Sequence, residues 1–147
     1  MILVKLKCDK KINERLRFYD IDKRKLENFL NYHTNNLVPT RKWWTYDIAV
    51  KGIAGNSSQY FWNEDELEVA LQCVDCSSKK QRRIYFLQSL VHEYRHWVQA
   101  QLQKVPEKKL SYTDKDIEEQ TDSYTKNKYE IECKEWEKIV EEFNKYL

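Results

Sequence analysis

The chain has 147 residues, of which 41% are hydrophobic and 34% are charged, and its formal net charge is +2. Five Trp and ten Tyr give too much apolar bulk for an intrinsically disordered protein, and the length suits one domain with a real core. The nearly balanced charge gives no strong signal for nucleic-acid binding, and the compact basic run at residues 79–83 is more typical of a solvated surface. We therefore expect a single domain spanning residues 1–147.

No apolar run in the sequence approaches the roughly 20 residues that a membrane-spanning helix needs. The first residues become charged too early for a secretory signal, so we expect a cytoplasmic protein, in the host cytoplasm if the chain is phage-encoded. The four cysteines are then expected to be reduced thiols. Cys73 and Cys76 form an isolated CxxC without a second pair at the spacing of a structural zinc site, which favours packing over metal binding.

The first half of the chain is predicted to be rich in strands. Alternating or β-rich segments predict strands at residues 1–7, 43–53, 59–62 and 66–74. Residues 52–58 contain both glycines and predict a turn. One helix is expected over residues 22–35, capped by Asp20 or Asp22. His33 shares the apolar face of this helix, which favours a place in the core or at its rim over a role as a metal ligand.

The second half of the chain is predicted to be helical. Ser77 and Ser78 offer a cap for a long helix over residues 79–104, which Pro106 ends. A polar connector and two further helices are expected at residues 107–113, 114–124 and 128–147. On the last helix, apolar residues recur at every third or fourth position: Tyr129, Cys133, Trp136, Val140, Phe143 and Leu147.

The long predicted helix contains the motif H-E-x-x-H, written here as HEYRH at residues 92–96. Residues four apart lie on the same face of a helix, so His92 and His96 can bind one zinc ion together. Glu93 lies about 100° around the helix from His92 and can reach a water on the metal as a general base. The two histidines share a polar seam between two apolar strips, which indicates that they line a cleft. The sequence therefore predicts a catalytic zinc site.

A catalytic zinc ion generally has three protein ligands and one water molecule. No histidine follows His96, so the third ligand is expected to be His33, a carboxylate or a cysteine. A glutamate of the C-terminal helix is the economical choice, and helical periodicity alone places Glu132 nearer the apolar stripe than Glu130. The carboxylates that stay open on this reasoning are Glu130, Glu132, and Glu118 with Asp122 four residues on.

HEYRH together with the segment YEIECKEW at residues 129–136 resembles the glutamate-type zinc metallopeptidases, the gluzincins. The resemblance is to the small one-domain forms of bacteria and phages and to the related ImmA/IrrE-like proteases, and it covers about residues 66–140. It implies an α+β, zincin-like fold, in which a small twisted, mainly antiparallel sheet packs on the active-site helix and the C-terminal helices.

The family pattern E-x-E-A-x-x-F-A assigns roles on the last helix. Its first Glu falls on Glu130, which the resemblance makes the third zinc ligand, and its first small residue falls on Cys133. The aromatic position is Trp136. Two positions depart from the pattern: the final small residue is Glu137, and the Asp or Asn that buttresses a ligand in the family is Lys134.

The expected function is zinc-dependent hydrolysis of a peptide or protein substrate, with Glu93 as general base and His92, His96 and Glu130 as ligands. Candidates for an oxyanion donor are Tyr112, Tyr124 and His33. The strand at residues 66–74 is expected to be the edge on which an extended peptide adds. The alternative is a zinc-binding protein of the same fold without turnover, acting as a binding or regulatory module. A nucleic-acid or protein-partner module using residues 79–83 is less favoured, no membrane contact is expected, and the sequence predicts no oligomeric state.

Overall fold

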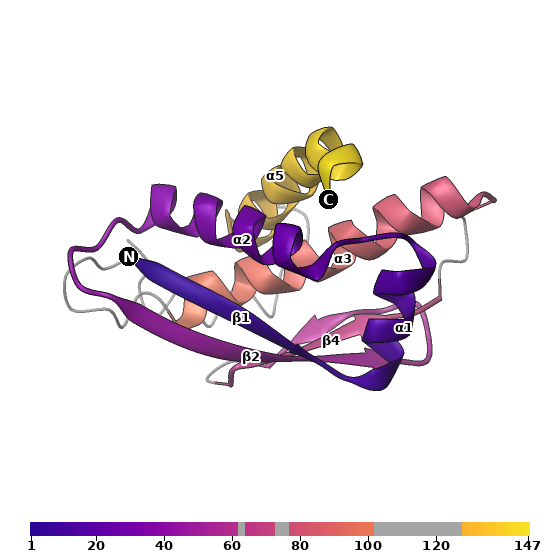
Figure 1. The fold of residues 1–147 in the computed structure, drawn as a ribbon, viewed down its shortest axis with the longest axis horizontal. Coiled ribbons are helices and arrows are strands. Elements are labelled where there is room, and N and C mark those ends of the chain that lie inside the picture. Colours follow the sequence, from indigo (N-terminus) through magenta and orange to yellow (C-terminus); the bar gives the residue numbers. More distant parts are fainter. Residues whose placement is uncertain (62–63, 73–76, 102–127) are drawn as a thin grey trace.

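The computed structural model describes residues 1–61, 64–72, 77–101 and 128–147. Within these ranges the chain combines a four-stranded sheet with helices, which is compatible with the expected α+β class. The strands are β1 (Ile2–Cys8), β2 (Trp44–Ile53), β3 (Gln59–Tyr60) and β4 (Glu66–Ala70). The helices are α1 (Lys10–Phe18), α2 (Lys23–Leu37), α3 (Lys79–Gln101) and α5 (Lys128–Phe143), and a 3-10 turn follows at Asn144–Tyr146. Figure 1 shows α2, α3 and α5 on one side of the sheet and α1 at its end.

The strand order in the sheet is β1-β2-β4-β3. β1 and β2 are parallel, from the pair Ile2 and Trp44 to the pair Cys8 and Val50, and β2 and β4 are also parallel. Only β3 is antiparallel to its neighbour β4. The expectation of a mainly antiparallel sheet is therefore wrong. For β1 and β2 the reason is the crossover through α1 and α2, because a helical connection of that length can return the chain to the sheet in the same direction. β4 follows β3, which is antiparallel to it, and so runs parallel to β2.

The outer edge of β1 is covered by side chains of α2. Three polar residues spaced four apart on this helix accept hydrogen bonds from alternate backbone N–H groups of β1. The pairs are Glu27 with Leu6 at 2.8 Å, Asn31 with Val4 at 2.7 Å and Asn35 with Ile2 at 2.6 Å. The amides of Asn31 and Asn35 also donate back to strand carbonyls. The helix thus satisfies backbone groups that an uncovered edge strand would expose.

β4 is not the open edge that the sequence predicts for peptide binding. It lies between β2 and β3, and β3 pairs with it at Leu67 and Glu68. Next to this pairing, the Ala70 backbone N–H donates to the Ser58 hydroxyl at 2.8 Å. The expectation that a substrate adds to β4 is therefore wrong, because the short strand β3 and the loop before it already occupy that side.

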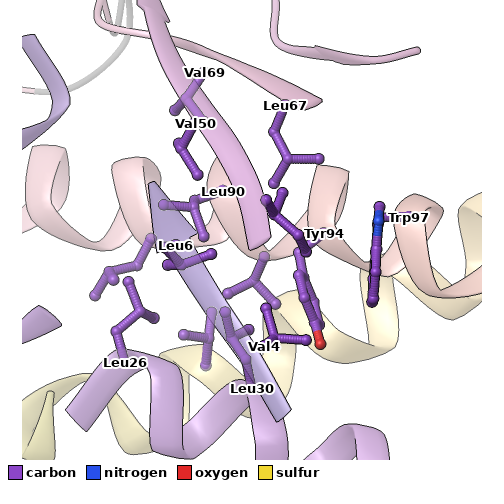
Figure 2. Close-up of a cluster of buried hydrophobic side chains, with 14 of the residues drawn as sticks. Val4, Leu6, Leu26, Leu30, Val50, Leu67, Val69, Leu90, Tyr94 and Trp97 are labelled. Carbon is purple, nitrogen blue, oxygen red and sulfur yellow. The ribbon is translucent and has the colours of Figure 1, made fainter. Parts of the chain in front are cut away.

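The main core lies between the sheet and the helices. Alternate residues of the strands are buried, which confirms the half-buried alternation expected for these segments. Figure 2 shows Leu90, Tyr94 and Trp97 of α3 together with apolar side chains of the three longer strands and of α2. The buried Tyr94 hydroxyl bonds to the Thr34 hydroxyl at 2.6 Å, which ties α3 to α2.

The sequence pattern does not predict helix α1. Only Ile12 and Leu16 of its nine residues are buried, so its apolar stripe is short. Its start carries a signal nonetheless, because the Asp9 side chain accepts a hydrogen bond from the Ile12 backbone N–H at 2.9 Å. The second carboxylate oxygen of Asp9 accepts from the Gly52 N–H at 3.0 Å, which joins the helix start to β2.

The other expected elements agree with the structure within a few residues. Asp22 caps α2, as one of the two expected caps, and the Ser78 hydroxyl accepts from the Gln81 N–H at the start of α3. None of the helices in the described ranges is long and apolar enough to cross a membrane. The connector at 107–113, the helix expected at 114–124 and the CxxC at 73–76 lie outside the described residues.

Candidate metal centre

Helix α3 brings the two motif histidines together in a largely buried setting. Their ring centroids are 5.1 Å apart, and the rings lie one turn apart along the helix, as the motif spacing predicts. The His96 residue is 7% exposed, and the buried polar residues beside it on α3 are Glu93, Arg95 and Gln99. Buried polar groups need partners, so the contacts of these side chains define the site.

Glu130, on the first turn of α5, lies against both histidines. One carboxylate oxygen is 3.0 Å from Nε2 of His92, and the other oxygen is 3.0 Å from Nε2 of His96. The two imidazoles and the carboxylate therefore converge on one small volume between α3 and α5. This is the set of side chains that the resemblance assigns to the metal.

A glutamine fixes the orientation of His96. The Gln99 amide nitrogen donates to the Tyr129 backbone carbonyl at 3.0 Å, and the Gln99 amide oxygen lies 2.8 Å from His96 Nδ1. A backbone carbonyl only accepts, so the amide oxygen of Gln99 must accept the Nδ1 proton of His96. With Nδ1 donating to Gln99, the ring nitrogen that faces Glu130 is Nε2, and a metal there would take the place of the proton that Nε2 donates to the carboxylate.

Glu137 contacts Nδ1 of His92, as Gln99 contacts Nδ1 of His96. Its carboxylate lies 3.4 Å from His92 Nδ1, one helical turn beyond Cys133 on the same side of α5. Sequence reasoning treats Glu137 only as a departure from the family pattern. Its distance of seven residues from Glu130 places it on the same helical face, and that spacing is the signal that could have identified it. Glu137 thus contacts His92, a candidate ligand, although Lys134 stands at the position that buttresses a ligand in the family pattern.

Glu132, the alternative third ligand, lies elsewhere. It forms an ion pair with Arg95, a residue that is 3% exposed and whose guanidinium also lies over the Trp136 ring, 5.3 Å from its centroid. An acid that compensates a buried guanidinium is needed there, because an unpaired charge in that position would be costly. The structure therefore brings Glu130, and not Glu132, to the histidines.

The electrostatics of the site follow from burial and from these close pairs. Burial alone would lower the pKa of His92, but hydrogen bonds to Glu130 and Glu137 outweigh it and raise the pKa to about 10. Burial would raise the pKa of Glu130, but hydrogen bonds from His92 and His96 hold it well below its usual range. For Glu93, burial dominates and raises the pKa of the carboxyl group. A group with a raised pKa is suited to take up a proton near neutral pH.

Cys133 completes the polar cluster. The Cys133 sulfur and one nitrogen each of His92 and His96 all lie within 4.8 Å of one another. Burial raises the pKa of the Cys133 thiol, so the thiol keeps its proton unless a cation lies beside it. Two imidazoles, a carboxylate and a thiol are donors that suit zinc, so the side chains present fit the metal that the motif predicts.

The other candidate residues do not join this group. His33 lies among aromatic rings, 4.5 Å from the Phe29 ring centroid and 5.8 Å from that of Trp136, which agrees with its expected place at the rim of the core. Burial lowers its pKa. Outside the described residues lie the two other oxyanion candidates and the distant acidic pair: Tyr112, Tyr124, Glu118 and Asp122.

The basic run at residues 79–83 forms the first turns of α3. The Arg83 side chain turns inward and donates to the backbone carbonyl of Tyr19 at 2.7 Å and to that of Asn144 at 2.6 Å. Lys79 lies over the exposed Phe18 ring, 4.6 Å from its centroid. Part of this run therefore has a structural use within the chain itself.

Comparisons of the chain with protein-family models, with curated proteins and with solved structures give no match.

Proposed function

We propose that this chain is a zinc-dependent peptidase whose metal is held by His92, His96 and Glu130. The observation that carries the proposal is the position of the Glu130 carboxylate, with one oxygen 3.0 Å from Nε2 of each histidine. The three side chains come from two helices that are far apart in sequence. Their convergence supports a metal centre more strongly than the H-E-x-x-H motif does alone.

The chain's own groups suit this chemistry. A zinc ion would supply a Lewis acid for the substrate carbonyl and would lower the pKa of a bound water to about 7. Gln99 and Glu137 accept hydrogen bonds from Nδ1 of the two histidines, and both Nε2 atoms lie beside Glu130. This division of the ring nitrogens is the one that two neutral imidazole ligands need.

Glu93 is the general base in this proposal. It follows His92 directly, it is 7% exposed, and its electrostatic neighbours include both histidines and Glu130. Its raised pKa favours uptake of a proton from the attacking water, and the same carboxyl group then returns that proton to the leaving amine. Zinc binding does not require Glu93, so removal of its charge separates turnover from metal binding.

Metal content tests the ligand set. The purified protein should contain stoichiometric zinc, and the His92→Ala and Glu130→Ala variants should lose most of it. Glu135→Ala is the matched control, because Glu135 is an exposed acid on the same helix α5 and should leave the zinc content unchanged. Equal zinc in Glu130→Ala and Glu135→Ala would overturn the ligand assignment.

Hydrolysis tests the enzyme assignment. The zinc-loaded protein should cleave peptide bonds in a mixture of unfolded proteins. New peptide ends detected by mass spectrometry measure this cleavage. Glu93→Gln should retain zinc and lose cleavage by a factor of at least about 10², the size of a general-base contribution. If the zinc-loaded protein cleaves nothing and Glu93→Gln is indistinguishable from it, the alternative of a zinc-binding protein without turnover replaces the peptidase.

A further inference from the structure

Helix α5 places a thiol beside the proposed metal ligands. Cys133 follows Glu130 by three residues, so the two side chains lie on the same face of α5, the face turned toward α3. The Cys133 residue is fully buried and forms no disulfide. The proposed peptidase mechanism assigns it no role.

The Cys133 sulfur lies close to the two imidazoles of the proposed site. Its sulfur and the two imidazole nitrogens lie within 4.8 Å of one another, and both imidazoles already contact Glu130 at 3.0 Å. Tetrahedral zinc with ordinary bond lengths holds sulfur and nitrogen ligands about 3.6 Å apart and two nitrogen ligands about 3.3 Å apart. A contraction of about 1 Å would bring the Cys133 sulfur and the two imidazole nitrogens to the spacing of ligands on one ion, at a site where Glu130 already contacts both imidazoles.

We infer that Cys133 is a fourth metal ligand that competes with water for the last coordination position of the centre. This inference rests on the proposed function, since it concerns the same metal. The two histidines and Glu130 leave one position of a tetrahedral ion open, and a catalytic site needs that position for water. Coordination by Cys133 releases the thiol proton to solvent and leaves no place for the water.

Two properties follow from a closed donor set. Sulfur beside nitrogen favours zinc and cobalt over magnesium, calcium and manganese, which prefer oxygen ligands. Turnover is then limited by withdrawal of Cys133 from the metal. A Cys133→Ala variant should therefore bind zinc at least about tenfold more weakly, by comparison with the loss of an outer-shell partner, and should cleave peptides faster when saturated with zinc.

Cobalt spectroscopy tests the inference without any assay of activity. Protein loaded with Co²⁺ in place of zinc should show the visible bands of a four-coordinate ion and a near-ultraviolet thiolate-to-cobalt charge-transfer band. Cys133→Ala should keep the visible bands and lose the charge-transfer band. Cys8→Ala is the control, because Cys8 is a free thiol at the end of β1 and its variant should keep both features.

The outcomes separate this inference from the proposed function. Visible cobalt bands without a charge-transfer band in the unaltered protein, or a band that persists in Cys133→Ala, would overturn the role of Cys133 and leave the peptidase proposal standing. Failure of the protein to bind cobalt or zinc would overturn both. If Cys133→Ala does not fold, X-ray absorption of the zinc-loaded protein decides. One zinc–sulfur distance of about 2.3 Å supports the inference, and its absence refutes it.

Discussion

The contact between Gln99 and His96 gives the sharpest test of how this site is built. Gln99 is fully buried, and its amide joins His96 Nδ1, at 2.8 Å, to the Tyr129 carbonyl of α5, at 3.0 Å. Leucine has nearly the same volume but offers neither donor nor acceptor. Gln99→Leu therefore removes both hydrogen bonds with little change in packing. The variant no longer fixes which ring nitrogen of His96, a proposed metal ligand, carries the proton.

The contact distances indicate how far zinc affinity should fall in each variant. Loss of a group that orients a metal ligand costs about 10- to 100-fold in metal affinity, which equals about 1.4–2.7 kcal/mol. Gln99→Leu should reach the upper part of this range, because the contact is short and shielded from water. Glu137→Gln should stay near the lower end, since the contact to His92 is 3.4 Å long, the Glu137 side chain is 29% exposed, and the new amide still offers an oxygen.

Competition with a chromogenic chelator measures the zinc affinity, and thermal unfolding in excess chelator measures the stability of the metal-free chain. Each buried polar group left without a partner costs about 1–3 kcal/mol, so Gln99→Leu should also unfold at a lower temperature. Gln88→Leu is the matched control. Gln88 lies on the same helix, and its two contacts to α5 are long, at 3.4 and 3.5 Å, so their loss should cost little. Wild-type affinity and stability in Gln99→Leu would refute the reasoning.

Three further predictions concern pH and packing. In the metal-free chain, the contacts to Glu130 and Glu137 outweigh burial and raise the pKa of His92 from 6.5 to about 10. The protonated His92 therefore contributes its full stabilisation below pH 6.5 and loses it as the pH rises towards 10. The melting temperature should fall over this range. Asn31→Ala should lower the free energy of unfolding by about 1–3 kcal/mol in urea titrations, because it uncovers a buried strand N–H group. Thr34→Val should cost a similar amount, about 1–3 kcal/mol, because it leaves the buried Tyr94 hydroxyl without its partner.

Each of these predictions has its control. Saturation with zinc should abolish the fall in melting temperature, and an equal fall in both forms would contradict the link to the metal site. Asn28→Ala removes an exposed side chain from the same helix α2 and should change stability little. Thr34→Ser keeps the hydroxyl and should retain most of the stability, so a loss in Thr34→Ser as large as that in Thr34→Val would contradict the assignment of the effect to the hydroxyl contact.

The sequence predicts the positions of most strands and helices but not the direction of the strands. Alternation in Ile2–Cys8 and Trp44–Ile53 is typical of antiparallel sheets with one solvated face, whereas parallel strands are usually buried on both faces. Here α2, α3 and α5 lie on one side of the sheet, so its parallel strands alternate as well (Figure 1). Direction depends on the connection between them, and one of the two helices in that connection is α1, whose two buried residues are too few to produce a periodic signal.

The choice between Glu130 and Glu132 shows a second limit. Helical periodicity measures how far each side chain lies from the apolar stripe of its own helix, and it favours Glu132 on that basis. It carries no information about the neighbouring helix. On α3 the flank that faces Glu132 holds the buried cation of Arg95, which pairs with this acid, whereas the two imidazoles face Glu130. Only the packing of two helices decides between the acids.

The ladder of side chains from α2 onto β1 has a consequence for how this protein meets extended chains. The N–H groups of Ile2, Val4 and Leu6 already have acceptors within 2.8 Å, and a strand arriving on that flank would have to displace a whole helix to gain the same bonds. Neither a second copy of the protein nor any other extended peptide can lengthen the sheet at β1 without displacing α2. The helix occupies the place that a fifth strand would take, and it blocks edge-to-edge pairing of the sheet at β1.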